Sequence, residues 1–143
     1  MWAYFDTSAL VKRYVDEAGR REVLTLLRRH ECVSSALLPV ELRSGLRRRV
    51  VDGSLEAARL PLILRRVAAD RPYWTLVEVG ADVLAAAESL VGAYSIRTLD
   101  ALHVASAQLF AARLSMPALM FVSADRRQTE TAVAVGLAAQ QIV

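Results

Sequence analysis

The sequence has 143 residues, of which 55% are hydrophobic and 23% charged, so it can form one ordered domain over residues 1–143 with a packed core. No apolar run approaches the roughly 18 residues of a membrane span, and the start lacks a secretion signal, so we expect a cytoplasmic protein without membrane attachment. The net charge of +3 comes from 17 arginines and one lysine, which permits a nucleic acid partner, and the single cysteine excludes an internal disulfide.

Apolar runs typical of strands alternate with segments of helical periodicity along the chain. In chain order we expect a strand over 2–5, helices over 7–17 and 20–30, a strand over 32–34, helices over 35–51 and 54–71, a strand over 73–79, helices over 81–94 and 98–115, a strand over 118–122, a helix over 123–135 and an edge strand over 137–143. No hairpin signal separates the strands. The sequence therefore predicts an α/β fold with a mostly parallel central sheet and helices on both faces.

Candidate caps and prolines mark several of the predicted helix boundaries. Ser34 and Ser35 are candidate N-caps of the third helix, and Thr98 is the candidate cap of the sixth. Pro61 falls inside the fourth helix and predicts a kink or a break there. Pro117 separates the sixth helix from the buried strand that follows it.

Asp6 lies where the first predicted strand passes into the first helix, followed by Thr7 and Ser8. Open α/β sheets bind ligands beyond the carboxyl ends of their strands, so a carboxylate at this position can belong to a functional site. The alternative is that Asp6 only caps the helix, because Asp, Ser and Thr are all good helix starters.

Three further carboxylates occupy unusual positions. Glu41 lies in the most apolar stretch of its helix, where a solvated glutamate is not expected, and Asp100 follows the candidate cap Thr98 by two residues. Asp125 follows a buried strand, as Asp6 does. Structural alternatives exist here too: a favourable interaction with the helix dipole for Asp100, and capping for Asp125.

A doubly wound sheet can gather these four carboxylates at one edge, where they would repel one another. Such a pocket must take up protons or bind a hard cation. A ligand set of oxygens, without cysteine or a pair of histidines, indicates magnesium or manganese rather than zinc. A cation of this kind can lower the pKa of a bound water, clamp a phosphate and stabilise an in-line displacement.

Four segments together resemble one known family. They are the opening segment from Tyr4 to Lys12, Glu41 within its helix, the segment from Thr98 to Ala105, and the segment from Phe121 to Arg127. In this order they closely resemble PIN-domain ribonucleases, in particular the VapC toxins of prokaryotic type II toxin-antitoxin systems, over essentially the whole chain. The resemblance implies a PIN-like three-layer sandwich and a magnesium- or manganese-dependent endoribonuclease that hydrolyses RNA phosphodiesters.

The resemblance also assigns roles to individual residues. The catalytic pocket that it implies consists of four acids, Asp6, Glu41, Asp100 and Asp125. Two of them, Asp6 and Asp100, would be direct metal ligands, while the other two complete the site directly or through water. Ser8 and Ser123 would supply hydroxyls that orient a ligand or a water. His103, one turn after Asp100, is expected to pack beneath the pocket rather than act as a base or a ligand.

The same resemblance implies two protein partners, a second copy of the chain in a homodimer and a VapB-like antitoxin. The antitoxin would lie on the apolar groove of the helices over 35–71 and plug the acidic pocket with a basic side chain. Pro61 departs from the family pattern in one of these helices. A basic stripe on the helix of Glu41 either contacts RNA phosphates or forms a solvated helix face, and consists of Arg43, Arg47, Arg48 and Arg49. Within this stripe, Arg43 and Arg47 are the expected RNA contacts.

Two other interpretations remain open. A catalytically silent PIN-like scaffold would bind RNA or protein without cleaving it, and the presence of all four acids speaks against it. A receiver-like signalling domain is also a small doubly wound domain with acids and magnesium at strand ends. It would need a lysine beyond a late strand, whereas the only lysine here is Lys12.

Overall fold

The computed structural model describes residues 1–116 and 118–143, so the predicted break at Pro117 lies outside the described residues. Five parallel strands form one sheet in the order β3-β2-β1-β4-β5. The strands are β1 (Trp2–Phe5), β2 (Glu31–Ser35), β3 (Thr75–Val77), β4 (Met120–Ser123) and β5 (Ala138–Gln141). The predicted α/β fold with a parallel central sheet is therefore confirmed.

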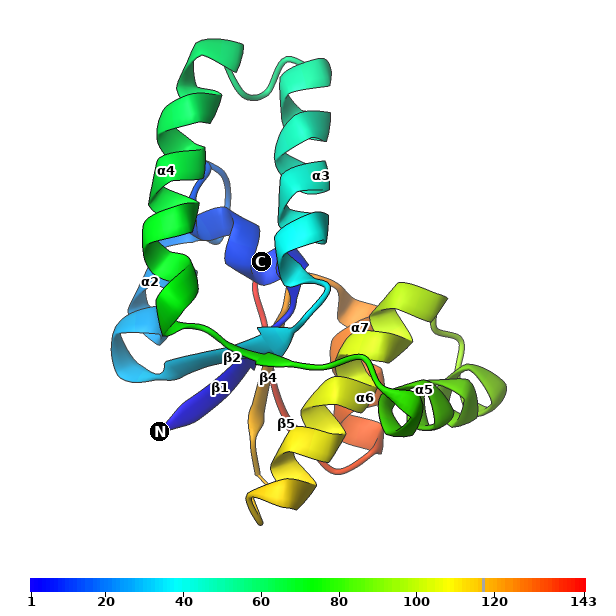
Figure 1. The fold of residues 1–143 in the computed structure, drawn as a ribbon. Coiled ribbons are helices and arrows are strands. Elements are labelled where there is room, and N and C mark those ends of the chain that lie inside the picture. The colour runs from blue at the N-terminus through cyan, green and yellow to red at the C-terminus, as the bar shows by residue number, and fades with distance from the viewer. Residues whose placement is uncertain (117) are drawn as a thin grey trace.

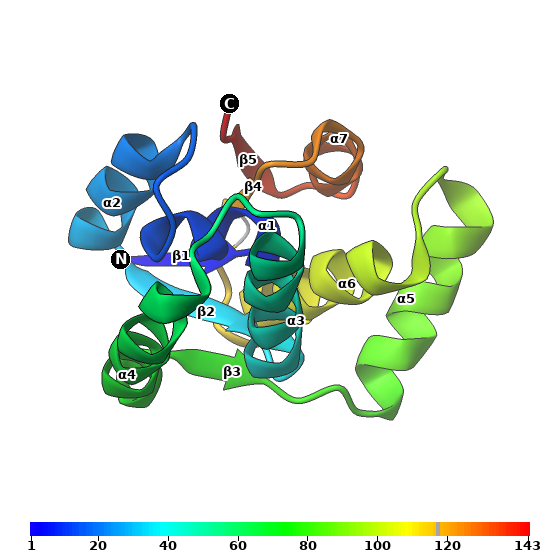
Figure 2. The ribbon, with the colours of Figure 1, turned by 90° about the horizontal axis from the view of Figure 1, so that it is seen from above.

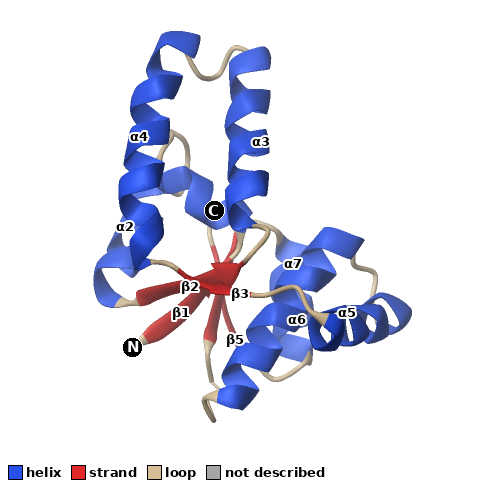
Figure 3. Cartoon of the chain, in the orientation of Figure 1, coloured by secondary structure: helices blue, strands red, loops and turns tan. Residues whose placement is uncertain are grey.

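Helices cover both faces of the sheet (Figures 1 and 2). One face carries α5 (Ala81–Ala93), α6 (Thr98–Arg113) and α7 (Arg126–Ala134). The other face carries α1 (Thr7–Leu10), α2 (Arg20–Arg29) and the start of α3 (Leu38–Val51). Figure 3 shows the strands between these two groups of helices, which is the three-layer arrangement that the sequence predicts.

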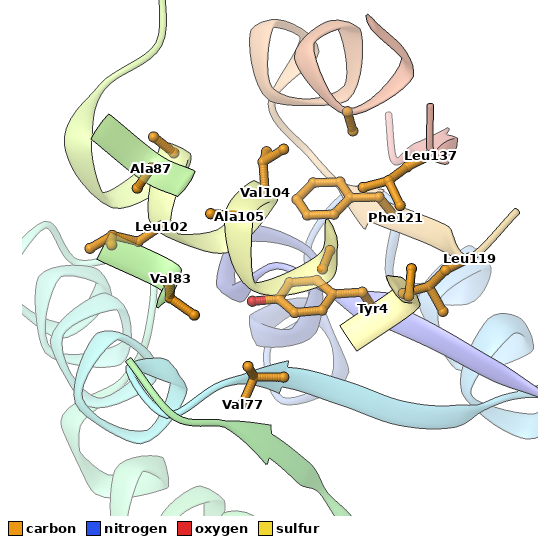
Figure 4. Packing of buried hydrophobic residues seen from close by; sticks show 14 of the residues in the cluster. Tyr4, Val77, Val83, Ala87, Leu102, Val104, Ala105, Leu119, Phe121 and Leu137 are labelled. Atoms are coloured by element: carbon orange, nitrogen blue, oxygen red, sulfur yellow. The ribbon is translucent and has the colours of Figure 1, made fainter. Parts of the chain in front are cut away.

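The two apolar faces arise because side chains alternate along each strand. In β1, Tyr4 points toward α5, α6 and α7, whereas Ala3 and Phe5 point toward α1 and α2. Tyr4 stacks on Phe121 of β4 with ring centroids 5.3 Å apart, and Figure 4 shows the two rings next to each other, close to Val104 and Ala105 of α6. Each large side chain buried in this way stabilises the fold by about 1.5–3 kcal/mol. The packing fixes where the carboxyl ends of β1 and β4 lie.

A helical hairpin stands away from the sheet (Figure 1). It consists of α3 and α4 (Leu60–Asp70), and Leu42 and Leu46 of α3 pack in one apolar cluster with Ile63 of α4. The predicted interruption at Pro61 is confirmed, because no continuous helix runs over 54–71: α4 starts at Leu60, and Pro61 lies in its first turn, where the missing N–H has no helical partner to lose. A separate 3₁₀ turn precedes α4, so the fourth helix begins later than predicted.

The end of α4 is joined to the segment that follows α1. Asp70 accepts hydrogen bonds from Arg13 Nε at 2.6 Å, from Arg13 Nη2 at 3.1 Å and from the Tyr14 hydroxyl at 2.6 Å. Burial by itself would raise the pKa of Asp70, but these donors outweigh it and hold the pKa below its usual value. The Asp70 carboxylate therefore stabilises the hairpin against the sheet in its charged form.

Three further predicted helix boundaries are wrong. The first helix ends early, at Leu10 with one further 3₁₀ turn, and Arg20 donates from Nη1 to the carbonyl of Arg13 at 2.6 Å in the irregular segment that follows. Ser34 belongs to β2 and donates to the carbonyl of Phe5 at 2.7 Å instead of capping α3. Thr98 is the first residue of α6, not its cap. At Ser34 a partner distant in sequence displaces the local signal, whereas at Thr98 the boundary shifts by one residue.

The second predicted cap of α3 also lies in β2. Ser35 is the last strand residue, and its hydroxyl accepts from the N–H of Leu37 at 3.1 Å, which shapes the turn before the helix begins. The remaining strands and helices agree with the prediction within a few residues at each end. Within the described residues, no helix combines the length and the apolar character needed to cross a membrane.

The carboxyl edge of the sheet contains a switch point in the order of the strands. The chain passes from β1 to β2 and β3 on one side, and then crosses β1 to form β4 and β5 on the other. Ligands of doubly wound sheets bind at such a point. A receiver-like domain has β3 next to β1, whereas here β3 lies beyond β2. The strand order therefore excludes the receiver interpretation.

Candidate active site

The four predicted carboxylates line one cavity of about 770 Å³ at the carboxyl edge of the sheet, here called the acidic cavity. Asp6 follows β1 and Asp125 lies two residues after β4. Glu41 lies in the first turn of α3, which follows β2, and Asp100 lies in the first turn of α6. Two neighbouring strands and two helix starts thus bring together four acids that are far apart in sequence.

Asp6 is both a helix cap and a wall of the acidic cavity. One carboxylate oxygen, Oδ2, accepts from the N–H of Ser8 at 2.9 Å, which caps α1. The other, Oδ1, accepts from Gln128 Nε2 at 3.0 Å. The residue is 5% exposed, so its position and orientation are fixed from within the protein. Asp6 can therefore cap the helix and line the cavity at the same time, because Oδ2 makes the cap while Oδ1 bonds Gln128.

Asp125 has the same double character at the end of β4. Its Oδ1 accepts from the N–H groups of Arg127 at 2.9 Å and Gln128 at 3.3 Å, which caps α7. Its own N–H donates to the Ser123 hydroxyl at 3.0 Å. These bonds hold the turn after β4 in a fixed geometry, with the side chain at the cavity wall.

The predicted hydroxyls, Ser8 and Ser123, join the ends of β1 and β4 to each other. Their oxygens are 3.2 Å apart, and Ser8 Oγ accepts from the N–H of Ala124 at 3.1 Å. Ser123 Oγ donates to Gln128 Oε1 at 2.6 Å. Ser8 lines the acidic cavity, whereas Ser123 is completely buried behind it. The two hydroxyls therefore act on the site mainly by positioning its walls.

Gln128 is one residue of this site that the sequence interpretation missed. Its side chain is completely buried and its amide contacts three parts of the site. Because Oε1 accepts from Ser123, Nε2 must face Asp6, and it also lies 3.3 Å from the carbonyl of Asp100. The available signal was its place three residues after the cap Asp125, a spacing typical of a capping box, although the side chain turns inward instead.

Glu41 is held by a second group of hydrogen bonds. Its Oε1 accepts from the Thr7 hydroxyl at 3.0 Å and lies 2.5 Å from His103 Nε2. The other ring nitrogen of His103 is 2.9 Å from the Tyr4 hydroxyl and 3.5 Å from Asp6 Oδ1. Burial would lower the pKa of His103, but the charges of Asp6 and Glu41 outweigh burial and raise it above its usual value. His103 lies buried beneath the cavity, where both ring nitrogens have partners.

The ionised form of Asp100 is disfavoured in the acidic cavity. Burial raises its pKa above the usual value, and the charges of Asp6 and Asp125 raise it further. The guanidinium of Arg97 opposes this effect, with Nε 3.5 Å from Asp100 Oδ2 and Nη2 4.0 Å from Asp125 Oδ2. The cavity therefore attracts cations. One such cation is the guanidinium of Arg97, which lies against Asp100 and Asp125.

The predicted RNA-contact residues, Arg43 and Arg47, do not line the acidic cavity, whereas Arg48 and Arg49 of the same helix do. The reason is helical phase: with 3.6 residues per turn, a position seven residues after Glu41 returns to its face, and positions two or six residues on do not. Arg49 is committed to Glu17, with contacts of 3.0 Å to each carboxylate oxygen, and lowers the pKa of that carboxyl.

The side chains of the acidic cavity match the hard oxygen donors of magnesium and manganese sites. Among the residues that the structure describes, however, no three His, Cys, Asp or Glu side chains form a group arranged to hold a metal ion. In this arrangement Asp6 accepts from N–H donors, and Arg97 lies against Asp100 and Asp125. The donor chemistry and the raised pKa of Asp100 fit a cation that would take the place of Arg97.

Comparisons with known proteins agree with this architecture. A search of curated proteins finds no match. Among solved structures, a chain of a structure described as a toxin-antitoxin complex from Klebsiella pneumoniae has a similar fold, with a TM-score of 0.68, 20% identity, and coverage of 98% of this chain and 99% of that chain. The family model of the PIN domain matches residues 3–134, which confirms the resemblance seen in the sequence. Because that match spans nearly the whole length, this chain belongs to the PIN-domain family.

Proposed function

We propose that this chain is a magnesium- or manganese-dependent endoribonuclease and the toxin of a VapBC-type toxin-antitoxin pair. The observation that carries the proposal is the meeting of four carboxylates in one cavity at the switch point of the sheet. PIN domains are generally nucleases, and the chain belongs to that family. Nuclease sites that hold divalent cations with carboxylates cleave phosphodiesters by in-line displacement.

Asp6 and Asp100 would hold the cation, with Glu41 and Asp125 completing the site. When bound, the cation would supply a water of lowered pKa and neutralise charge on the phosphate. Gln128 and the N–H of Ser8 keep the Asp6 carboxylate aimed at the cavity, so little reorganisation is needed when a ligand enters. Glu41, fixed by Thr7 and His103, is a positioned acceptor that can orient a water or hold a proton.

The proposed partners are an RNA substrate, a VapB-like antitoxin and a second copy of the chain. The neighbour described as a toxin-antitoxin complex supports the antitoxin. Exposed apolar side chains on the α3–α4 hairpin, Val40, Val51 and Leu62, suit an amphipathic antitoxin segment. A guanidinium of the antitoxin could occupy the acidic cavity, as Arg97 does in part here. Copurification with the product of the neighbouring small open reading frame tests the antitoxin, and light scattering tests the homodimer.

A catalytically silent scaffold is the competing function. The observation that favours it is the placement of Arg97 against Asp100 and Asp125, since a permanently bound guanidinium would keep a cation out. Arg97 is 84% exposed, however, and exposed ion pairs contribute only about 0–1 kcal/mol. Displacing this side chain is therefore easy, and the nuclease is the better supported function.

The test is to incubate purified, antitoxin-free protein with mixed RNAs, with and without magnesium or manganese, and to map the ends produced. Hydrolysis by an activated water is expected to leave a 5′-phosphate and a 3′-hydroxyl. An Asp100→Asn variant should be inactive under the same conditions. Cleavage that persists in excess chelator, or products with 2′,3′-cyclic phosphates, would contradict the proposal.

A further inference from the structure

A second cavity of about 750 Å³ adjoins the acidic cavity. It is lined by Ser95, Ile96, Arg97, Asp100, Asp125, Arg126 and Arg127. The two cavities share Arg97 and the two aspartates, so they meet at the boundary formed by Asp100 and Asp125. Beyond that boundary the charged lining of the second cavity is made of guanidinium groups, and we name it the arginine cavity.

Arg97 lies at the junction of the two cavities and is weakly held there. Its contacts with Asp100 and Asp125 are long, at 3.5 and 4.0 Å, and its side chain is 84% exposed. An exposed pair of this kind contributes at most about 1 kcal/mol. The side chain can therefore exchange carboxylate partners for phosphate oxygens at low cost, and a guanidinium binds phosphate through the same paired N–H groups.

The other two arginines come from the start of α7 and differ in their partners. Arg126 donates from Nε to Glu130 at 2.8 Å on the surface of the helix. The backbone N–H of Arg127 contributes to the cap by Asp125, while its side chain lines the arginine cavity. Of the other basic side chains of the acidic cavity, Lys12 and Arg49 both bond Glu17, whereas Arg48 donates to the Ser44 hydroxyl at 3.1 Å.

We propose that the arginine cavity binds the phosphates of a single RNA strand on one side of the phosphate held in the acidic cavity. This inference rests on the proposed function and adds the path of the substrate. Arg97 and Arg127 contact phosphates of the entering strand, and Arg97 leaves the acids when the strand binds. The contacts carry no sequence information, because phosphates are common to all sequences.

The depth of the acidic cavity favours a single strand over a duplex. Asp6 is only 5% exposed, so a phosphate that reaches it must enter below the surface of the molecule. A flexible single strand can bend into this recess and still reach the arginine cavity beside it. An A-form duplex presents its phosphates along a regular outer surface and is recognised by its shape.

The experiment measures binding of a fluorescein-labelled, unstructured 12-nucleotide RNA by anisotropy over a range of salt concentrations. The buffer contains a chelator, and a gel run in parallel verifies that the RNA stays intact. The double variant Arg97→Gln/Arg127→Gln is compared with Arg43→Gln/Arg47→Gln, which removes the same charge from exposed positions outside both cavities. Melting by circular dichroism verifies that both variants fold.

Removing one arginine that binds a phosphate is expected to reduce the slope of log K against log salt by about 0.7 for single-stranded nucleic acid. The slope of the arginine-cavity variant should therefore fall by about 1.4, while the control variant keeps the wild-type slope. Equal slopes for all three proteins, equal reductions in both variants, or tighter binding of a matched duplex would overturn the proposal.

Cleavage by the wild-type protein, measured separately with magnesium or manganese, distinguishes this inference from the proposed function. If the wild type cleaves RNA but the slope of the variant is unchanged, the arginine cavity is not the path. If the slope falls as expected and the wild type does not cleave, the strand-binding surface is supported and the nuclease proposal fails.

Discussion

Gln128→Leu should destabilise the fold although leucine is close in size to glutamine. The substitution removes the donor to Asp6 Oδ1 at 3.0 Å, the contact with the carbonyl of Asp100 at 3.3 Å and the acceptor of the Ser123 hydroxyl at 2.6 Å. Because Gln128 is completely buried, water cannot replace these bonds.

The size of this loss in unfolding free energy follows from the kind of hydrogen-bond partner that Gln128 has. A hydrogen bond to a charged acceptor contributes about 1.5–3 kcal/mol and a neutral one about 1 kcal/mol, so the three together contribute about 4 kcal/mol. Burying the leucine side chain returns about 2 kcal/mol. The free energy of unfolding should therefore fall by about 2 kcal/mol, and the Tm by about 6 °C for a chain of this length.

Urea denaturation followed by far-UV circular dichroism at pH 7, with a chelator present, measures the change. The matched control is Gln140→Leu, which also removes an amide that donates to a carboxylate, here Glu22 at 2.7 Å, but from a half-buried position in the edge strand β5. Its cost should stay below about 1 kcal/mol, because water can solvate the partner. Equal destabilisation in the two variants, or a Gln128→Leu protein as stable as the wild type, would refute the reasoning.

Three further outcomes are expected. In metal-free buffer, Asp100→Asn should raise the free energy of unfolding by up to about 1 kcal/mol, because it relieves repulsion from Asp6 and Asp125 at a partly exposed position. A loss of stability in urea denaturation would contradict this. The stability advantage of the wild type over Asp70→Asn should be constant above about pH 5 and shrink as the pH falls below about 4. The reason is that the pKa of Asp70 is lower in the folded state than its unfolded value of about 3.9. Urea denaturation between pH 7 and 2 tests this, and a stability difference that grows at low pH would contradict it. Burial raises the pKa of Cys32 to about 12, so its thiol should resist a disulfide reagent at pH 8 in the native protein and react in urea. Rapid labelling of the native protein would contradict this, because it would show that the thiol is accessible.

The sheet was predictable because its signals are local and repeated. Strand-type runs followed within three residues by an acid identified both Asp6 and Asp125, and parallel pairing then places such residues at one edge. Glu41 could be identified because a charged residue is not expected in the most apolar stretch of a helix. The break at Pro61 was predictable from the proline itself. The place of Ser34 in β2 was not, since a tertiary hydrogen bond to the carbonyl of Phe5 decided it.

The remaining parts of the site depend on the direction of side chains. Gln128 could be identified as part of a capping motif, but only the fold shows that its amide turns toward Asp6. Helical phase alone predicts that Arg48 and not Arg47 faces the acidic cavity. The seventh residue after Glu41 lies on the same face of the helix as Glu41, and the sixth does not. The proximity of Arg97 to Asp125 depends on how α6 and α7 pack and has no local signal.

The most direct test of the acidic cavity is calorimetric titration of manganese into the purified, antitoxin-free protein. The wild type should bind the cation, and Asp100→Asn should weaken binding at least about tenfold. Asp82→Asn, at an exposed acid of α5 that pairs with Arg113, is the matched control and should bind as the wild type does. Wild-type protein without measurable manganese binding, or Asp100→Asn with wild-type affinity, would contradict the assignment of these carboxylates to a metal-dependent nuclease site.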